Sequence, residues 1–253
     1  MAIAIVLAAG SGSRMNSDVA KQYMMLCGKE VLFYSLQTFQ NHADIKNIIL
    51  VTREEEISYC KENIVARYGF DKVGTICAGG KERYESVYNG LVSSEAAEDD
   101  IVLIHDAARP FVTAQMIDDS ICAAREYGAC TVGMPVKDTI KIVDENNFGI
   151  DTPERSRVYQ VQTPQTFRYG LLMSAYENML LQKNHMSNDE KMNNKIDNKK
   201  QADDKNYKIT DDTMLVEQYR GVRSKIVPGA YENIKITTPE DMEIASKFAE
   251  KFF

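Results

Sequence analysis

The stretch AIAIVLAAGSGSRM, residues 2–15, decides the fold of this chain. Its first six residues are all apolar, a length and composition typical of a strand that is buried on both faces of a sheet. Residues 8–13 are only alanine, glycine and serine, small residues that let backbone N–H groups close around an anion such as phosphate. The stretch therefore predicts a central strand that leads into an anion-binding loop.

Outward from this strand, apolar runs alternate with amphipathic stretches through the first half of the chain. This order predicts an α/β, Rossmann-like fold, a mostly parallel twisted sheet with helices on both faces. Right-handed crossovers then bring the loops after Leu7, Ala78 and His105 to one edge of the sheet, where ligands bind. The expected strands are residues 2–7, 45–52, 73–78, 101–105 and 129–135, and the expected helices are 31–40, 54–68, 84–94 and 114–127.

The second half of the chain departs from this alternation. Residues 138–161 contain two β-like runs, 139–143 and 157–161, which predict a protruding β-arm. Such an arm could pack on a second copy of the chain, or it could be a surface excursion with no partner. Residues 183–208 are dense in Asn, Lys and Asp and bury too little apolar surface to offset chain ordering, so we expect a mobile polar insert. The remaining expected elements are a helix at 209–219, strands at 221–227 and 233–237, and a helix at 239–252 that begins after Thr238.

The composition is that of an ordinary globular protein, and we expect one domain over residues 1–253. The net charge of −7 argues against nonspecific nucleic-acid binding, although a site can still gather cations for a polyanion. The five cysteines form no CxxC pair and only three histidines are present, so neither a disulfide framework nor a zinc site is expected. No apolar run approaches the roughly 18 residues of a membrane helix. The short N-terminal run lacks the basic leader of a signal peptide, and we therefore expect a cytoplasmic protein.

Two cations follow the first loop, Arg14 and Lys21. A tight turn with two solvated cations is the simpler interpretation, but the order of strand, glycines and cations favours contacts to a triphosphate. Two other phosphate-binding motifs, which resemble this loop, do not match the sequence. The dinucleotide fingerprint needs a third glycine where Met15 stands, and the P-loop needs Gly-Lys-Ser/Thr.

Two further signals follow later strands at the same predicted edge. Asp106 ends a strongly apolar strand, where a carboxylate can hold Mg²⁺ or a substrate hydroxyl, or simply cap a helix. Arg109, three residues on, favours a phosphate site. A second signal is the turn Gly79-Gly80-Lys81-Glu82-Arg83, which Ser86 follows closely. By itself this turn is weak evidence for a binding site, because Gly-Gly turns are common.

Together these residues resemble the 2-C-methyl-D-erythritol 4-phosphate cytidylyltransferase family of the non-mevalonate isoprenoid pathway. The resemblance spans nearly the whole chain, in family order. It departs from the family at residues 183–208, which are longer and more polar than expected, and at Lys81, where relatives often carry aspartate. The matching elements are residues 7–15, Lys21-Gln22-Tyr23, 79–87, 105–110, 135–139, Thr163-Pro164-Gln165-Thr166-Phe167, Thr210-Asp211-Asp212 and 233–237.

The resemblance implies a nucleotidyltransferase fold, with residues 138–161 as a homodimerisation arm that could lend Arg155 to the partner's site. It implies CTP and a sugar-alcohol phosphate as substrates and Mg²⁺ as cofactor, held mainly by the CTP phosphates with Asp106 as a weak protein ligand. It implies catalytic roles for Arg14, Lys21, Arg155 and Lys235. The implied CTP-binding residues are Ala8, Ala9, Gly10, Ser11, Gly12, Arg14, Lys21, Gly79, Gly80, Lys81, Arg83, Ser86, Asp106 and Ala107. The implied acceptor-binding residues are Asp106, Arg109, Thr139, Arg155, Thr163, Thr210 and Lys235.

The expected reaction is an in-line attack of an acceptor phosphate oxygen on the α-phosphorus of CTP, in which cations offset the repulsion between two polyanions. His105 is expected to pack rather than act as a base, because a phosphate dianion has no proton to lose. Two alternatives stay open: a ribitol 5-phosphate cytidylyltransferase, and a catalytically silent nucleotide-binding regulatory protein. A bifunctional chain with a cyclase domain is not expected, because the transferase pattern fills the sequence.

Overall fold

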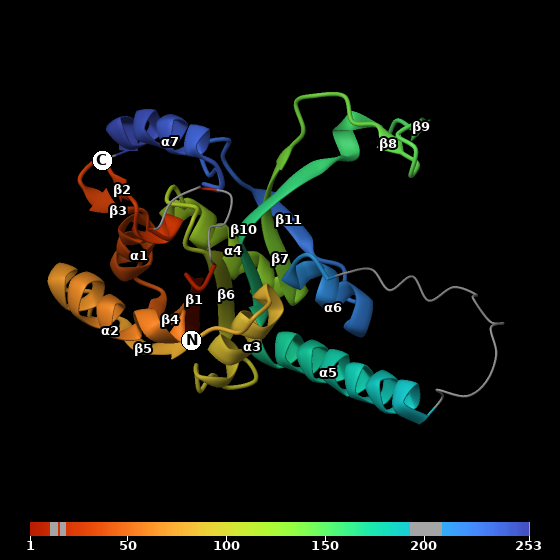
Figure 1. Cartoon of the computed structure of the whole chain (residues 1–253), viewed down its shortest axis with the longest axis horizontal. Helices are drawn as coiled ribbons and strands as arrows, with labels where there is room; N and C mark the ends of the chain where they lie inside the picture. The colour runs from red at the N-terminus through yellow and green to blue at the C-terminus, as the bar shows by residue number, and fades with distance from the viewer. Residues whose placement is uncertain (11–14, 16–18, 193–208, 253) are drawn as a thin grey trace.

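A seven-stranded sheet forms the centre of the computed structural model, which describes residues 1–10, 15, 19–192 and 209–252 (Figure 1). The strand order is β11-β7-β10-β6-β1-β4-β5, and β1 lies in the interior between β6 and β4. All neighbouring pairs are parallel except those of β10, which runs antiparallel to both β6 and β7. The strands are β1 Ala2–Leu7, β4 Ile45–Thr52, β5 Val73–Ala78, β6 Ile101–Asp106, β7 Ala129–Pro135, β10 Tyr159–Arg168 and β11 Lys225–Pro228.

Helices cover both faces of the sheet and enclose two separate cores. In β1, Ala2, Ala4 and Val6 face one core and Ile3 and Ile5 face the other, because successive side chains of a strand point to opposite faces. The first core contains side chains of α1 Val31–Asn41, α4 Ala114–Tyr127, α7 Pro239–Phe252 and the π-helical turn η4 Cys60–Ala66. The second contains side chains of α3 Arg83–Val92, α5 Tyr169–Met192 and α6 Asp212–Arg220.

A close helix–sheet contact sets the position of α3. A Cβ built on Gly90 would lie 2.6 Å from Ile5 Cγ2 and 2.9 Å from Val51 Cγ2, distances that no real side chain tolerates. Glycine is therefore required where this helix crosses β1 and β4. The contact holds α3 against the sheet, and the helix begins shortly after β5 ends at Ala78.

Most of the predicted alternation is confirmed. The strands at 2–7, 45–52, 73–78 and 129–135 and the helix at 114–127 have the expected bounds, while the strand at 101–105 ends one residue later. The helix expected at 54–68 is divided into η3 Glu54–Glu56, α2 Ile57–Tyr59 and η4. Shorter elements precede α1: η2 Lys21–Tyr23, β2 Met25–Leu26 and β3 Lys29–Glu30.

The predicted protruding arm is present, and its two β-like runs do not pair with each other. The run at 139–143 contributes β8 Ile142–Val143, which pairs with β9 Gly149–Asp151 and not with the run at 157–161. That second run, after the turn η5 Arg155–Arg157, begins β10, and Tyr159 pairs with Pro135 of β7. Figure 1 shows β8 and β9 projecting away from the body of the sheet.

Four further expectations are wrong in whole or in part. Residues 233–237 form no strand, and Ile236 N instead donates to the Ala108 carbonyl at 2.9 Å. The helix expected at 209–219 and the strand expected at 221–227 begin later, as α6 and β11. The loop expected from Lys183 is helical up to Met192, the end of α5. The rest of that insert, residues 193–208, lies outside the described residues.

Candidate active site

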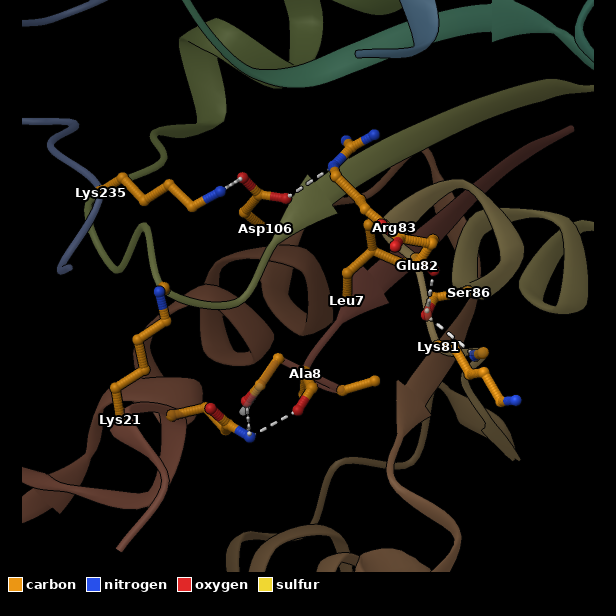
Figure 2. Close-up of a pocket in the computed structure, with 14 residues that line it drawn as sticks. Leu7, Ala8, Lys21, Lys81, Glu82, Arg83, Ser86, Asp106 and Lys235 are labelled. Atoms are coloured by element: carbon orange, nitrogen blue, oxygen red, sulfur yellow. Dashed lines mark hydrogen bonds and ion pairs between the residues drawn. The ribbon is translucent and has the colours of Figure 1, made fainter. Parts of the chain in front are cut away.

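A pocket of about 330 Å³ opens at the edge of the sheet where β1 and β6 end and α3 begins (Figure 2). This is the edge that the sequence predicts. Lys21 and Lys235 lie on one side of the view in Figure 2, and Lys81 and Ser86 on the other. The lining residues are Leu7, Ala8, Ala9, Gly10, Lys21, Gln22, Gly80, Lys81, Glu82, Arg83, Ser86, Asp106, Ala108 and Lys235.

Gln22 holds the described part of the first loop. Its Nε2 donates to the Ala8 carbonyl at 2.6 Å and lies 3.3 Å from the Gly10 carbonyl. The side chain is 2% exposed, so these bonds fix the loop in a setting with little competition from water. Gln22 belongs to η2, and the same turn brings Lys21 to the pocket wall. The predicted residues Ser11, Gly12 and Arg14 lie outside the described residues.

The Gly-Gly turn after β5 forms the opposite wall. Gly80 N donates to Ser86 Oγ at 3.0 Å, and Glu85 closes a capping box with Glu82 at the start of α3. A Cβ on Gly79 would lie 2.6 Å from Ala9 Cβ and 2.7 Å from Ser86 Oγ. Glycine is therefore needed there for the turn to pack against Ala9 of the first loop.

Asp106 is the charged centre of the pocket. Its Oδ2 lies 2.6 Å from Lys235 Nζ and its Oδ1 lies 3.5 Å from Arg83 Nε (Figure 2). Burial alone would raise the pKa of Asp106, but Arg83, Lys235 and Arg109 outweigh burial and hold the pKa well below its usual range. Asp106 is therefore an anion that holds two cations at the pocket wall.

A second pocket, of about 230 Å³, adjoins the first, and Arg83, Asp106 and Lys235 line both. Arg109 donates its Nη1 to the Asn233 carbonyl at 2.7 Å, and its Nε is buried without a hydrogen-bond partner among the described residues. A buried donor of this kind suits an anionic ligand. The lining residues are Arg83, Asp106, Arg109, Val161, Gln162, Thr163, Gln165, Thr210, Asp211 and Lys235.

His105 is fully buried behind the smaller pocket, where it contacts the lining residues Thr163 and Arg109. Its Nδ1 hydrogen-bonds the Thr163 hydroxyl at 3.1 Å and its Nε2 the Arg109 carbonyl at 3.0 Å. The Thr163 hydroxyl also accepts from the Asp106 backbone amide at 3.1 Å. Burial lowers the pKa of His105 to about 4, so the ring is neutral at physiological pH and packs as expected.

The structure brings most of the predicted site residues together, but not all of them. Thr139 and Arg155 are exposed on the arm and line neither pocket; Arg155 Nη1 instead donates to the Lys137 carbonyl at 3.2 Å. Gly79 and Ala107 also line neither pocket. The lining residues that were not predicted as site residues are Leu7, Gln22, Glu82, Ala108, Val161, Gln162, Gln165 and Asp211. The one signal that could have found some of them is the set of matching motifs, which contain Leu7, Gln22, Glu82, Ala108, Gln165 and Asp211.

A metal site built by the protein alone is not present among the described residues, where no three acidic, histidine or cysteine side chains cluster suitably. Asp106 has an oxygen that could join a metal, but both of its oxygens already face cations. The residues therefore fit a divalent cation only if the nucleotide phosphates supply most of its ligands. Within the same described ranges, no helix is both long and apolar enough to cross a membrane.

A pocket of backbone groups and cations at the carboxyl edge of such a sheet, with a second cation-lined pocket adjoining it, is the arrangement that a nucleotidyltransferase needs to hold a nucleotide beside a second phosphate. Residues 2–199 and 192–251 match the family model described as IspD, 2-C-methyl-D-erythritol 4-phosphate cytidylyltransferase. The two matched ranges overlap at residues 192–199, inside the predicted polar insert. The chain belongs to this family and is a cytidylyltransferase.

Relatives and solved structures agree with this assignment. The chain is 43% identical over 247 residues to the 2-C-methyl-D-erythritol 4-phosphate cytidylyltransferase of Clostridium botulinum strain Langeland, covering 98% of this chain and 96% of the relative. The enzyme of the same name from Caldanaerobacter subterraneus is 42% identical, covering 98% of each chain. The crystal structure of 4-diphosphocytidyl-2C-methyl-D-erythritol synthase from Anaerococcus prevotii is 31% identical, with a TM-score of 0.78, covering 98% of this chain and 96% of that one.

Proposed function

We propose that this enzyme transfers CMP from CTP to 2-C-methyl-D-erythritol 4-phosphate, giving 4-diphosphocytidyl-2-C-methyl-D-erythritol and pyrophosphate. The observation that carries the proposal is the pair of adjoining pockets whose common wall is Arg83, Asp106 and Lys235. Two polyanions bound in these pockets would meet at that charged wall, which is what a reaction between two phosphates requires. The names of the relatives, which specify the acceptor, favour methylerythritol phosphate over ribitol 5-phosphate.

The larger pocket is proposed to bind CTP. Backbone groups of Ala8, Ala9 and Gly80, with Ser86, would hold the cytosine, because a narrow backbone-lined slot excludes the larger purines by shape. The first loop, from Gly10 through Ser11 and Gly12, would wrap the triphosphate together with Arg14 and Lys21. The same proposal gives Gly79, Lys81, Arg83, Asp106 and Ala107 supporting positions around the nucleotide.

The smaller pocket is proposed to bind the acceptor. The unpartnered Nε of Arg109 and the ammonium of Lys235 suit its phosphate, and Thr163, Thr210 and Asp106 offer hydrogen bonds to its hydroxyl groups. Thr139 and Arg155 line neither pocket of their own chain, so we propose that they reach the acceptor pocket of a second copy.

In the proposed reaction an acceptor phosphate oxygen forms a bond to the α-phosphorus of CTP while the bond from that phosphorus to the β-phosphate bridging oxygen breaks. The pyrophosphate takes the bond electrons, and no proton needs to move. Arg14, Lys21 and Lys235, with Arg155 of a second copy, would stabilise the charge that grows on the phosphoryl oxygens and the leaving group. Mg²⁺ bound to the nucleotide phosphates, with Asp106 as its one protein ligand, would supply further charge neutralisation there.

A homodimer through the arm, residues 138–161, completes the proposal. Large apolar side chains are exposed on the arm: Phe148 at 72%, Ile150 at 66%, and Ile142 and Val143 at 46% each. A cluster of this kind on a projecting hairpin supports an interface with a like surface. We also propose that residues 1–253 form one domain and that the enzyme works in the cytoplasm, where its five free thiols would stay reduced.

The test is a panel of nucleotides against acceptor phosphates, read by pyrophosphate release in the presence of Mg²⁺. We expect turnover with CTP and methylerythritol phosphate, and turnover at least about 100-fold lower with ribitol 5-phosphate or with ATP. Preference for ribitol 5-phosphate would replace the acceptor proposed here. Nucleotide binding without turnover of any acceptor would mark the chain as a silent regulatory protein.

A further inference from the structure

Arg83 lies in the wall of both pockets, and two carboxylates hold it. Its Nε lies 3.5 Å from Asp106 Oδ1, and its Nη1 lies 2.8 Å from Asp212 Oδ2. Nη2 has no partner among the described residues. The guanidinium is thus fixed at two points and keeps donors for a ligand in the region that the pockets share.

The two carboxylates differ in one respect: Asp106 lines both pockets, whereas Asp212 lines neither. Asp212 is 1% exposed at the first position of α6. The Tyr176 hydroxyl donates to its Oδ1 at 2.6 Å, and its backbone amide donates to Gln165 Oε1 at 2.9 Å. A carboxylate buried this deeply is stable only when paired, and the two partners of its side-chain oxygens are Arg83 and Tyr176.

We propose that Asp212, itself held by Tyr176, is a positioning residue that fixes Arg83 between the two pockets, so that one guanidinium serves phosphates of both substrates. The proposal rests on the function proposed above. It adds two residues, Asp212 and Tyr176, that would affect the reaction although they line neither pocket. Asp212 lines neither pocket and the Asp212 side chain pairs with Arg83, so we expect the charge of Asp212 to act on the reaction through Arg83.

The charge arrangement explains why a second carboxylate is needed. Lys235, Asp106, Arg83 and Asp212 form a row of alternating charges. A phosphate arriving in either pocket competes with Asp106 for Lys235 and for the Nε of Arg83. Asp212 lies outside the pockets and meets no such competition, so it keeps Nη1 in place while Nε changes partner. Without Asp212 the guanidinium would have Asp106 as its one remaining carboxylate anchor among the described residues, so both pockets would lose a cation held in a fixed position.

The test is a double-mutant cycle on the full-length enzyme with Arg83→Ala and Asp212→Asn. Asp212→Asn keeps the shape of the side chain and removes its charge. We expect it to lower kcat about 10–100-fold, as lost supporting contacts do at other sites, and to raise the KM for both CTP and the acceptor. In the Arg83→Ala background the same substitution should change neither kcat nor KM further, because its only route of action is gone.

Added guanidinium ion gives a second readout that a purely structural role would not move. It should partly restore kcat of Arg83→Ala, because the carboxylates of Asp212 and Asp106 remain and can bind the added ion. It should fail to restore the double variant. Glu30→Gln is the matched control: Glu30 is a buried carboxylate that accepts from Tyr68 at 2.8 Å, pairs with Arg67 and lines neither pocket. It should lower thermal stability and leave kcat and both KM values unchanged.

Additive effects in the cycle, an increase in only one of the two KM values, or equal guanidinium rescue of the single and double variants would each overturn the proposal. Should Asp212→Asn not fold, Tyr176→Phe replaces it in the cycle, since it frees Asp212 while keeping the ring. A lower kcat/KM of Tyr176→Phe, with no further decrease when it is combined with Arg83→Ala, supports the proposal. Wild-type kinetics of Tyr176→Phe contradict it. Absence of product from the wild-type enzyme would instead refute the proposed function.

Discussion

Removing the charge of Lys235 tests the electrostatic basis of the reaction most directly. Lys235 lies in the wall of both pockets, and its Nζ lies 2.6 Å from Asp106 Oδ2. Lys235→Met keeps the length of the side chain and removes the cation. Among the described residues, Arg83 and Arg109 would then be left to offset the charge of Asp106, so the common wall becomes less positive where two phosphates must meet.

The size of the effect follows from the charges involved. Two unit charges about 4 Å apart interact by about 4 kcal/mol at an effective dielectric constant of about 20. Since about 1.4 kcal/mol corresponds to a tenfold change in rate, that interaction sets an upper limit of roughly 10³ in kcat. The Lys235 side chain is 36% exposed, and water weakens its interaction. We therefore expect kcat to fall about 10²–10³-fold, the range found when one preorganised charge-stabilising donor is removed.

The assay is steady-state pyrophosphate release at saturating CTP and acceptor. Lys225→Met is the matched control, because it removes the same charge from an exposed residue that lines neither pocket. The control should keep wild-type kcat. If Lys235→Met also stays within about fivefold of wild type, the cationic wall does not drive the reaction and the reasoning is refuted.

Four other substitutions test separate parts of the structure. Lys21→Ala should keep the melting temperature and lower kcat about 10²–10³-fold; wild-type-like turnover would remove Lys21 from the mechanism. Phe148→Asp should turn a dimer into a monomer in light scattering, and a wild-type chain that is already monomeric contradicts the interface. Gly90→Val should lower the free energy of unfolding by about 1–3 kcal/mol in urea titrations, because its Cβ would overlap Ile5, and an unchanged midpoint would mean that α3 shifts freely. His105 has a folded-state pKa of about 4, below its usual 6.5, so the unfolded chain binds the proton more tightly and stability falls as the pH drops from 6.5 toward 4. Between pH 7 and pH 5, His105 should lower the free energy of unfolding by about 2 kcal/mol, and His105→Gln should not show this decrease. An equal decrease in both proteins would assign the effect to other groups.

The strands that the sequence predicts with correct bounds are those whose signal is local. β1 and β4 are nearly continuous apolar runs, so burial on both faces leaves few other interpretations. β10 was predicted only as its first residues, because Pro164 and the polar residues around it look like a loop. Its place in the sheet depends on pairing with β6 and β7, which lie far away in the sequence, and the ladder shifts register between Val161 and Gln165 where the proline lies.

The site residues likewise fall into those that local sequence signals predict and those that only tertiary packing brings together. Lys21, Gly80 and Asp106 follow directly from strands or tight turns, so a rule about strand ends is enough to predict their meeting. Asp212 and Tyr176 come from two helices on one face of the sheet, and only the packed structure brings them to Arg83. The strand predicted at 233–237 failed for a related reason: its alternating pattern is real, but the segment runs beside the loop after β6 and not along a sheet edge.

The register shift in β10 has a consequence for how freely this sequence can vary. Where the ladder is interrupted, side chains replace the neighbouring strand as partners: Asn233 Nδ2 donates to the Thr163 carbonyl at 3.0 Å, and the Thr131 hydroxyl to the Gln162 carbonyl at 3.2 Å. A backbone ladder accepts almost any residue, whereas these bonds require a particular one. We therefore expect Asn233 and Thr131 to tolerate few replacements although they line neither pocket, so homologues should vary little at these two positions.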